Sequence, residues 1–510
     1  MFSIFNTTSY KTGAALAVGA TAFWKIVSFA NSVFIAAYFG AQTRTDVYFY
    51  LIMLIGFGVT FTQRLNNAVL IPEAMFLEQE DPVQSRRFLT LCFYIYVLAA
   101  LGLCLWGLVL PVQTAEMFSR FSPSVLADEK ALVCAAFILF ATNLLTYYLT
   151  AVAEMHKFFG AAWLTPLNAL CPFLALIFFG KTLGIISMVY GFLVANAVQI
   201  FALIWLLRAK LHWDFTPRPC PIPSRARKNM LTGQTLAVID MINSLLPLYL
   251  ISGMGAGMVS ALNYCRQITD STTEVITNRV ANVSKIELTE NAAAGQTNVF
   301  NKNFLSTHHL LLFVLMPLAV FTAYFAQDVV AIFFERGRFT AQAAADTAAF
   351  LRPMVFMFVL MVPAYLQNNT IAAWLKVKES FPYALTSSLA FTLAAWLLIP
   401  RLGAFSYPYI LLGGLIFGFV LNYFLFRKYF PFVNYFRSFW ELFRLLAINI
   451  IALVPAAAVR MFLGEDNAFL NVLFSGSVYM TALLVISYKS RDLQLFLNTT
   501  EISRVVKKLF

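Results

Sequence analysis

The chain has 510 residues, of which 60% are hydrophobic and only 12% are charged. Soluble domains average roughly 45–50% apolar and about 25% charged residues, so this composition excludes an ordinary water-soluble fold. The net charge of +12 does not indicate nucleic-acid binding, because the basic residues gather in the tails and in alternate loops, as the positive-inside rule requires.

Apolar stretches long enough to cross a bilayer recur along the whole chain. Since a spanning helix needs roughly 20 mostly apolar residues, the sequence predicts about fourteen such helices. Their approximate ranges are 13–39, 46–71, 89–111, 130–154, 158–180, 182–207, 229–253, 257–284, 303–325, 343–373, 380–399, 404–427, 438–462 and 467–488. The alternating pattern of a membrane β-barrel is absent, so we expect an all-α polytopic membrane protein.

A basic, proline-rich stretch at residues 208–228 follows the sixth predicted helix. Its core from Thr216 to Ser224 is too rich in proline to be helical, so we expect an extended cytoplasmic linker. The linker separates an N-lobe (1–207) from a C-lobe (229–427), and residues 428–510 add two helices and a basic tail. Both termini are predicted to be cytoplasmic.

The two lobes are predicted to be parallel repeats of six helices. The second helix of each lobe is unusually polar, with Arg64 in one and Arg266 in the other. The third helix of each lobe is followed by a similar loop, at Met117–Ser122 and at Phe333–Thr340. The polar helices would then face each other across a central cavity.

The segment from Ala261 to Lys285 has membrane length but carries several charges. Arg266, Asp270 and Glu274 follow an i, i+4, i+8 spacing and share one face of a helix. Charges within a bilayer are costly and usually face a bundle interior or a water-filled cavity, which favours a transporter. The structural alternative is that Arg266 and Asp270 only neutralise each other as an i, i+4 pair.

Three further charges interrupt apolar helices. Lys25 lies too far inside the first helix to reach the interface easily, which favours a cavity role. Arg64 could bind a ligand or clamp two helices together. Asp240 could bind a coupling cation or a proton, or pair with a cation across the bundle. Because arginine suits phosphate, a cavity with Lys25, Arg64 and Arg266 would fit a pyrophosphate or another anionic headgroup.

No enzymatic, metal-binding or cofactor-binding motif is present. The six cysteines lack metal-ligand spacing and indicate packing residues. The His308–His309 pair near a helix end is interpreted as interfacial. Because there is no P-loop, transport should draw on an ion gradient, the membrane potential or a substrate gradient.

Two stretches resemble the MurJ (MviN) family of the MOP flippase superfamily, which moves lipid II, the lipid-linked peptidoglycan precursor, across the bacterial inner membrane. Residues 36–46 (AAYFGAQTRTD) resemble the family's first outer loop, and residues 334–340 (FERGRFT) resemble its FxxGxFT loop. The resemblance implies gating loops at Asp46, Arg336 and Arg338. It also implies a lipid-linked anionic glycan as substrate, contact with bilayer lipids, and the cell-wall synthesis machinery as a partner.

The chain departs from the family pattern inside the implied cavity. Lys25 replaces a family arginine, and Asn31 and Ser32 replace an Arg-Asp pair. A family arginine and glutamate align with Gln267 and Asp270. The resemblance implies a flippase that carries an undecaprenyl-pyrophosphate glycan by alternating access, with its cationic residues rearranged.

Three alternatives remain open at this point. The first is a flippase for another lipid-linked oligosaccharide, as carried by polysaccharide exporters of the same superfamily. The second is a multidrug exporter, which would prefer an acidic cavity. The third is a non-transporting scaffold of the same fold.

Overall fold

The computed structural model describes residues 10–211, 213–217, 235–272, 278–463, 467–490 and 492–499. All regular secondary structure in these residues is helical, and eleven of the described helices are long and apolar enough to cross a membrane. Two shorter apolar helices, Leu167–Leu183 and Val238–Ile251, fall where spanning segments were also predicted. The prediction of an all-α polytopic membrane protein is confirmed.

The chain folds into two compact units, Met1–Ser260 and Ala261–Phe510. The linker predicted at residues 208–228 lies within the first unit, and the preceding helix continues to Leu211. Residues 218–224 of its proline-rich core lie outside the described residues. The division into lobes at this linker stays a prediction.

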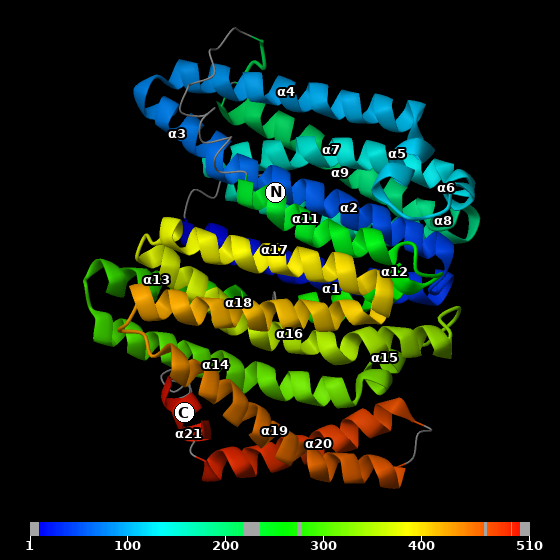
Figure 1. Ribbon diagram of the computed structural model, residues 1–510. Coiled ribbons are helices and arrows are strands. Elements are labelled where there is room, and N and C mark those ends of the chain that lie inside the picture. The colour runs from blue at the N-terminus through cyan, green and yellow to red at the C-terminus, as the bar shows by residue number, and fades with distance from the viewer. Residues whose placement is uncertain are drawn as a thin grey trace. The chain divides into compact units, whose positions relative to one another are not determined.

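The first unit is built around α7, which packs against α2, α4 and α9 (Figure 1). Its elements are α1 (Tyr10–Phe39), α2 (Thr43–Leu65), η2 (Asn66–Leu70), α3 (Ile71–Glu80), α4 (Pro82–Val109), α5 (Pro111–Phe118), α6 (Pro123–Asp128), α7 (Lys130–Met155), η3 (Phe159–Leu164), α8 (Leu167–Leu183), α9 (Ile186–Leu211) and α11 (Thr235–Ile251). Tyr148 of α7 is fully buried, stacks on Tyr96 with ring centroids 4.8 Å apart, and donates a hydrogen bond to the Leu89 carbonyl. The Tyr148 hydroxyl thus has a hydrogen-bond partner although it lies inside an apolar core.

In the second unit, α14 and α16 pack together, α18 packs on α16, and the α19–α20 pair packs through α19 on α14 (Figure 1). The elements are α12 (Met258–Thr272), α13 (Asn278–Ala293), α14 (Thr297–Tyr324), α15 (Ala326–Phe334), α16 (Ala341–Ala373), α17 (Val377–Leu402), η5 (Ala404–Ser406), α18 (Tyr407–Tyr429), α19 (Tyr435–Leu463), α20 (Ala468–Lys489) and α21 (Asp492–Thr499). The first turn of α12 belongs to the first unit. Residues 273–277, in the middle of the predicted helix 257–284, lie outside the described residues.

An equivalent aromatic pair occurs in each unit. Tyr50 of α2 meets Phe121 edge to face at 5.4 Å, and Tyr264 of α12 meets Phe339 edge to face at 5.3 Å. In both cases a tyrosine of the polar helix contacts the loop that was predicted to follow the third helix of its lobe. The internal repeat itself stays a prediction.

The polar second helix changes its geometry just after Arg64. Asn66–Leu70 form a π-helical turn between α2 and α3. The Asn66 Oδ1 atom accepts a hydrogen bond of 2.7 Å from the hydroxyl of Tyr96. π-Helical turns often occur at functional positions in helices. This turn therefore supports the neighbouring Arg64 as a candidate functional residue.

Candidate functional site

Arg64 and Asp240, whose roles the sequence left open, form an ion pair. The Arg64 Nη1 atom donates to the Asp240 Oδ2 atom at 2.6 Å, which joins α2 to α11 within the first unit. The two side chains remain 48% and 51% exposed. A half-exposed ion pair on apolar helices is expected to face a water-filled cavity rather than lipid. Its strength is modest, typically about 0–1 kcal/mol, so an anionic ligand can compete for Arg64.

Lys25 lies on α1 in a partly exposed position. Its Nζ atom sits 4.6 Å from the centroid of the Trp24 ring. A cation over an aromatic face is attracted electrostatically to the ring. The contact is therefore compatible with the predicted cavity role of Lys25.

Asn31 and Ser32 stand where the resemblance places a charged pair, and both are buried. The Asn31 side-chain amide donates to the Ala169 carbonyl at 2.9 Å, and the Ser32 hydroxyl donates to the Ser28 carbonyl at 3.3 Å. The Asn31 bond joins α1 to α8, whereas the Ser32 bond lies within α1. A single uncompensated charge at either buried position would be costly.

In the second unit, Arg266 is half-buried and is oriented by Tyr407. Its Nη2 atom donates to the Tyr407 hydroxyl at 2.9 Å, and its guanidinium carbon lies 5.8 Å from the centroid of that ring. A neutral hydroxyl fixes the guanidinium without cancelling its charge. Asp270, one turn further along α12, is exposed and interacts electrostatically with Arg266. Glu274 lies outside the described residues.

Asp46 is buried at the start of α2 and binds the beginning of α12. Its carboxylate accepts hydrogen bonds from the backbone N–H of Gly257 at 2.6 Å, from the backbone N–H of Ser260 at 2.7 Å and from the Ser260 hydroxyl at 2.5 Å. An acidic side chain at a helix N-terminus satisfies free N–H groups and complements the helix dipole. Asp46 thus fixes the turn before α12, at the outer loop predicted to act as a gate.

The loop that resembles FxxGxFT follows α15, and its matching residues shape the backbone. Phe334 and Phe339 are buried against Tyr264, and Gly337 has a positive φ of 63°. The Thr340 hydroxyl accepts a hydrogen bond of 3.2 Å from the Ala343 N–H and caps α16. The residues that match the FxxGxFT pattern therefore determine the conformation of the loop.

Arg336 and Arg338 occupy the variable positions of this loop, and both are exposed. Arg336 donates to the Ile332 carbonyl at the end of α15. The loop therefore presents two arginines from a rigid base.

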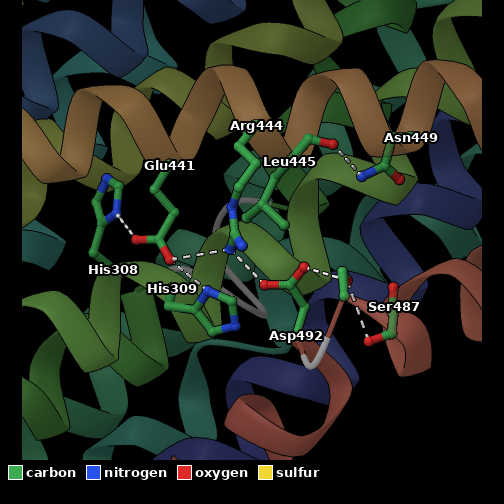
Figure 2. A network of polar contacts seen from close by, with 9 residues as sticks. His308, His309, Glu441, Arg444, Leu445, Asn449, Ser487 and Asp492 are labelled. Atoms are coloured by element: carbon green, nitrogen blue, oxygen red, sulfur yellow. Dashed lines mark hydrogen bonds and ion pairs between the residues drawn. The ribbon is translucent and has the colours of Figure 1, made fainter.

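Figure 2 shows a polar network that the sequence interpretation missed. His308 and His309 of α14 are buried rather than interfacial, and both contact Glu441 of α19. Glu441 in turn lies 3.9 Å from Arg444, which pairs with Asp492 of α21. Adjacent histidines on an apolar helix carry no signal of a carboxylate 132 residues away.

The family model for "Lipid II flippase MurJ" matches residues 35–481. The chain belongs to the MurJ family. A solved MurJ structure, a lipid II flippase in an inward closed conformation, is similar with a TM-score of 0.77 and 19% identity, covering 94% of this chain and 99% of that chain. No curated protein sequence matches the chain.

The MurJ fold is shared with multidrug transporters of the MATE family. An inward-facing MATE structure of the MOP superfamily has a TM-score of 0.62 and 12% identity over 83% of this chain and 95% of that chain. An outward-facing one has a TM-score of 0.56 and 10% identity over 84% and 93%. At such identities the likeness establishes the shared fold alone.

Proposed function

We propose that this MurJ-family protein translocates lipid II across the bacterial inner membrane by alternating access. Family membership supports the substrate, since the matching model describes lipid II flippases. The likeness to transporters solved in inward-facing and outward-facing conformations supports the mechanism, because the same architecture adopts both states. The protein carries no chemical step in this proposal and works without a cofactor.

Arg266 carries the substrate assignment. Its guanidinium is partly exposed and is held on the Tyr407 hydroxyl at 2.9 Å, and a guanidinium suits a planar, bidentate anion. The pyrophosphate of an undecaprenyl-linked glycan is such an anion, whereas a cationic drug would be repelled. Lys25 contributes a second positive charge, and the lipid tail stays in the bilayer.

The Arg64–Asp240 pair supplies an exchange step in this mechanism. While the cavity is empty, Asp240 neutralises Arg64 at 2.6 Å. The doubly charged pyrophosphate then replaces Asp240 as the partner of Arg64, at the small cost of opening a half-exposed pair. Asp240, once released, becomes a site for a proton or a coupling cation. Asp270 and Glu274 position or release the cations that bind the pyrophosphate.

The excess of basic residues in the tails and alternate loops supports cytoplasmic N- and C-termini. In this orientation the loops with Asp46, Arg336 and Arg338 lie on the outer side and form part of the gate. Exposed arginines there are suited to meeting the anionic glycan as it leaves. Enzymes of cell-wall synthesis that consume the flipped precursor are the proposed partners.

The test is complementation of a MurJ-depleted bacterium, with the accessibility of lipid II at the outer surface as the readout. The wild-type chain is expected to restore accessibility, and Arg266→Ala to lose it while the protein stays in the membrane. Arg437→Ala is the matched control, because this exposed arginine lies in the first turn of α19, outside the proposed cavity.

Failure of the membrane-inserted wild-type chain would move the assignment to another lipid-linked glycan or to a scaffold. Rescue with full activity of Arg266→Ala would retain the function and remove the cavity assignment.

A further inference from the structure

The two adjacent histidines of α14 share one carboxylate. The Nδ1 atoms of His308 and His309 lie 3.4 Å and 2.6 Å from the two carboxylate oxygens of Glu441. The imidazoles are 0% and 1% exposed. No described residue hydrogen-bonds the Nε2 atom of either ring. Buried polar atoms are nearly always paired. Two Nε2 atoms without a described hydrogen-bond partner, on rings that contact a carboxylate, therefore indicate proton acceptors rather than a purely structural contact.

The charges around the pair do not balance when both imidazoles are neutral. Glu441 and Asp492 are two carboxylates, and Arg444 between them is the one permanent cation that the described residues bring to the cluster. Arg444 donates to Asp492 (Figure 2). Asp492 also accepts a 2.6 Å hydrogen bond from the Ser490 hydroxyl. Among the described residues, α13, α16, α18 and α20 contribute no ionisable side chain to these contacts. One proton on the histidine pair would therefore neutralise the cluster.

The short helix α21 enters the cluster through Asp492, its first residue, which is buried. Further along α21, the ring of Phe496 packs on Phe313 with centroids 4.8 Å apart, and Phe313 stacks on His309. Among the described side chains, the helix is thus docked by an ion pair and an aromatic contact, and it also packs on α14 and α20. A helix of eight residues is the kind of small element that can open locally while the rest of a protein stays folded.

We propose that His308, His309 and Glu441 form a proton-binding site that controls the docking of α21. With neutral imidazoles, docking of Asp492 gives the cluster an uncompensated negative charge, and undocking leaves Glu441 paired with Arg444. With one imidazole protonated, docking gives a neutral cluster, and undocking leaves an uncompensated positive charge. Proton uptake and docking therefore favour each other, as linkage between two binding events requires.

Histidine is the side chain that ordinarily changes charge between about pH 5 and 8, so the proposal is to be tested over this range. Lower pH favours the docked helix, and higher pH favours its release. In the orientation proposed above, the site reads the cytoplasmic pH. The inference does not depend on which substrate the protein carries.

The first experiment is NMR of the full-length protein in lipid nanodiscs with isotopically labelled histidine. The chain has four histidines, and single replacements assign their signals. Between about pH 8 and about pH 5 we expect one imidazole of the pair to become protonated. Asp492→Asn should move that protonation to lower pH by about one unit, the usual effect of one nearby charge. A pair that stays neutral throughout, or an Asp492→Asn variant with an unchanged titration, would overturn the proposal.

The second experiment measures docking directly, with spin labels on the exposed residues Lys302 and Gln494 after replacement of the native cysteines. We expect a single narrow distance at about pH 5 and a broader distribution at about pH 8. His308→Gln with His309→Gln should remove this pH dependence. His156→Gln, which changes a histidine at the C-terminal cap of α7 outside the cluster, should preserve it. A distance that is independent of pH in the wild-type protein would show that the network is a fixed clamp.

Discussion

The guanidinium of Arg64 and the carboxylate of Asp240 lie 2.6 Å apart, although 176 residues separate them in the chain. The pair joins the polar helix α2 to α11 at the point where α2 passes into a π-helical turn. Two candidate site residues therefore form an ion pair with each other. In the proposed mechanism, each of them meets a ligand only when the other is displaced.

The contribution of this pair to protein stability can be separated from its role in transport only when both residues are changed. A double-mutant cycle with Arg64→Gln and Asp240→Asn is expected to give a coupling of about 0.2–1 kcal/mol in the free energy of unfolding, because both side chains are half exposed. Arg64→Gln should reduce lipid II transport roughly tenfold or more, equivalent to about 1.4 kcal/mol of lost binding. The exchanged variant, Arg64→Asp with Asp240→Arg, decides the role: restored transport would show a clamp, and absent transport would support a substrate ligand.

Tyr407→Phe tests whether Arg266 needs to be oriented. The variant loses one 2.9 Å hydrogen bond but keeps the aromatic ring under the guanidinium. We expect transport to fall about fivefold, in line with roughly 1 kcal/mol for one hydrogen bond, while the thermal midpoint stays nearly unchanged. Tyr409→Phe, an exposed tyrosine on the same helix, is the control. Equal activity of the two variants would mean that Arg266 is positioned by other contacts.

Asp46→Ala should destabilise the protein by roughly 3 kcal/mol or more. The substitution removes three hydrogen bonds to a buried carboxylate and leaves the N–H groups of Gly257 and Ser260 unpaired. Asp46→Asn keeps an acceptor oxygen and should be affected less. Thermal unfolding in detergent checks both variants, and an unchanged midpoint for Asp46→Ala would contradict the bonding described here.

Gly257 and Gly295 form a matched pair for testing close packing against backbone strain. Both have positive φ, at 87° and 66°, but a Cβ on Gly257 would lie 2.9 Å from the Ala41 carbonyl, whereas Gly295 has open space. Gly295→Ala should cost about 1–2 kcal/mol from the left-handed backbone alone. Gly257→Ala should cost clearly more in the same unfolding assay. Similar losses for the two variants would show that the loop before α12 yields easily.

Arg460→Ala should be more damaging than removal of both members of its ion pair. Arg460 Nη2 lies 2.9 Å from Asp328 Oδ2, and the two side chains are 22% and 7% exposed. Breaking the pair leaves a buried carboxylate and typically costs about 3–5 kcal/mol. Adding Asp328→Asn to Arg460→Ala should recover part of the thermal midpoint. No recovery would show that Arg460 acts through its packing on Tyr324 and Phe325 instead.

The spanning helices could be predicted because their signal is local. An apolar run of sufficient length identifies itself, so segments such as 89–111 and 130–154 closely match α4 and α7. The short helices α5 and α15 between spans could not be found this way, since an apolar segment of eight or nine residues has no length signal.

The partners of individual side chains could not be predicted from the sequence, for a different reason. Periodicity along one helix places Arg266 and Asp270 on a common face, but it does not indicate that Tyr407 receives the guanidinium. The burial of His308 and His309 likewise depends on Glu441 of a distant helix. Contacts of this kind follow from tertiary packing, which spacing within one segment does not encode.

The loop from Phe334 to Thr340 contains residues that determine its fold and residues that project from it. Its aromatic residues, Gly337 and Thr340 build a turn and start a helix, whereas Arg336 and Arg338 project from it. Natural selection on folding alone would preserve the first set, even in a descendant that had exchanged its cargo. The motif is therefore a marker of ancestry, and changes of cargo during evolution should be sought at positions such as Arg266, where we propose that the chain meets what it carries.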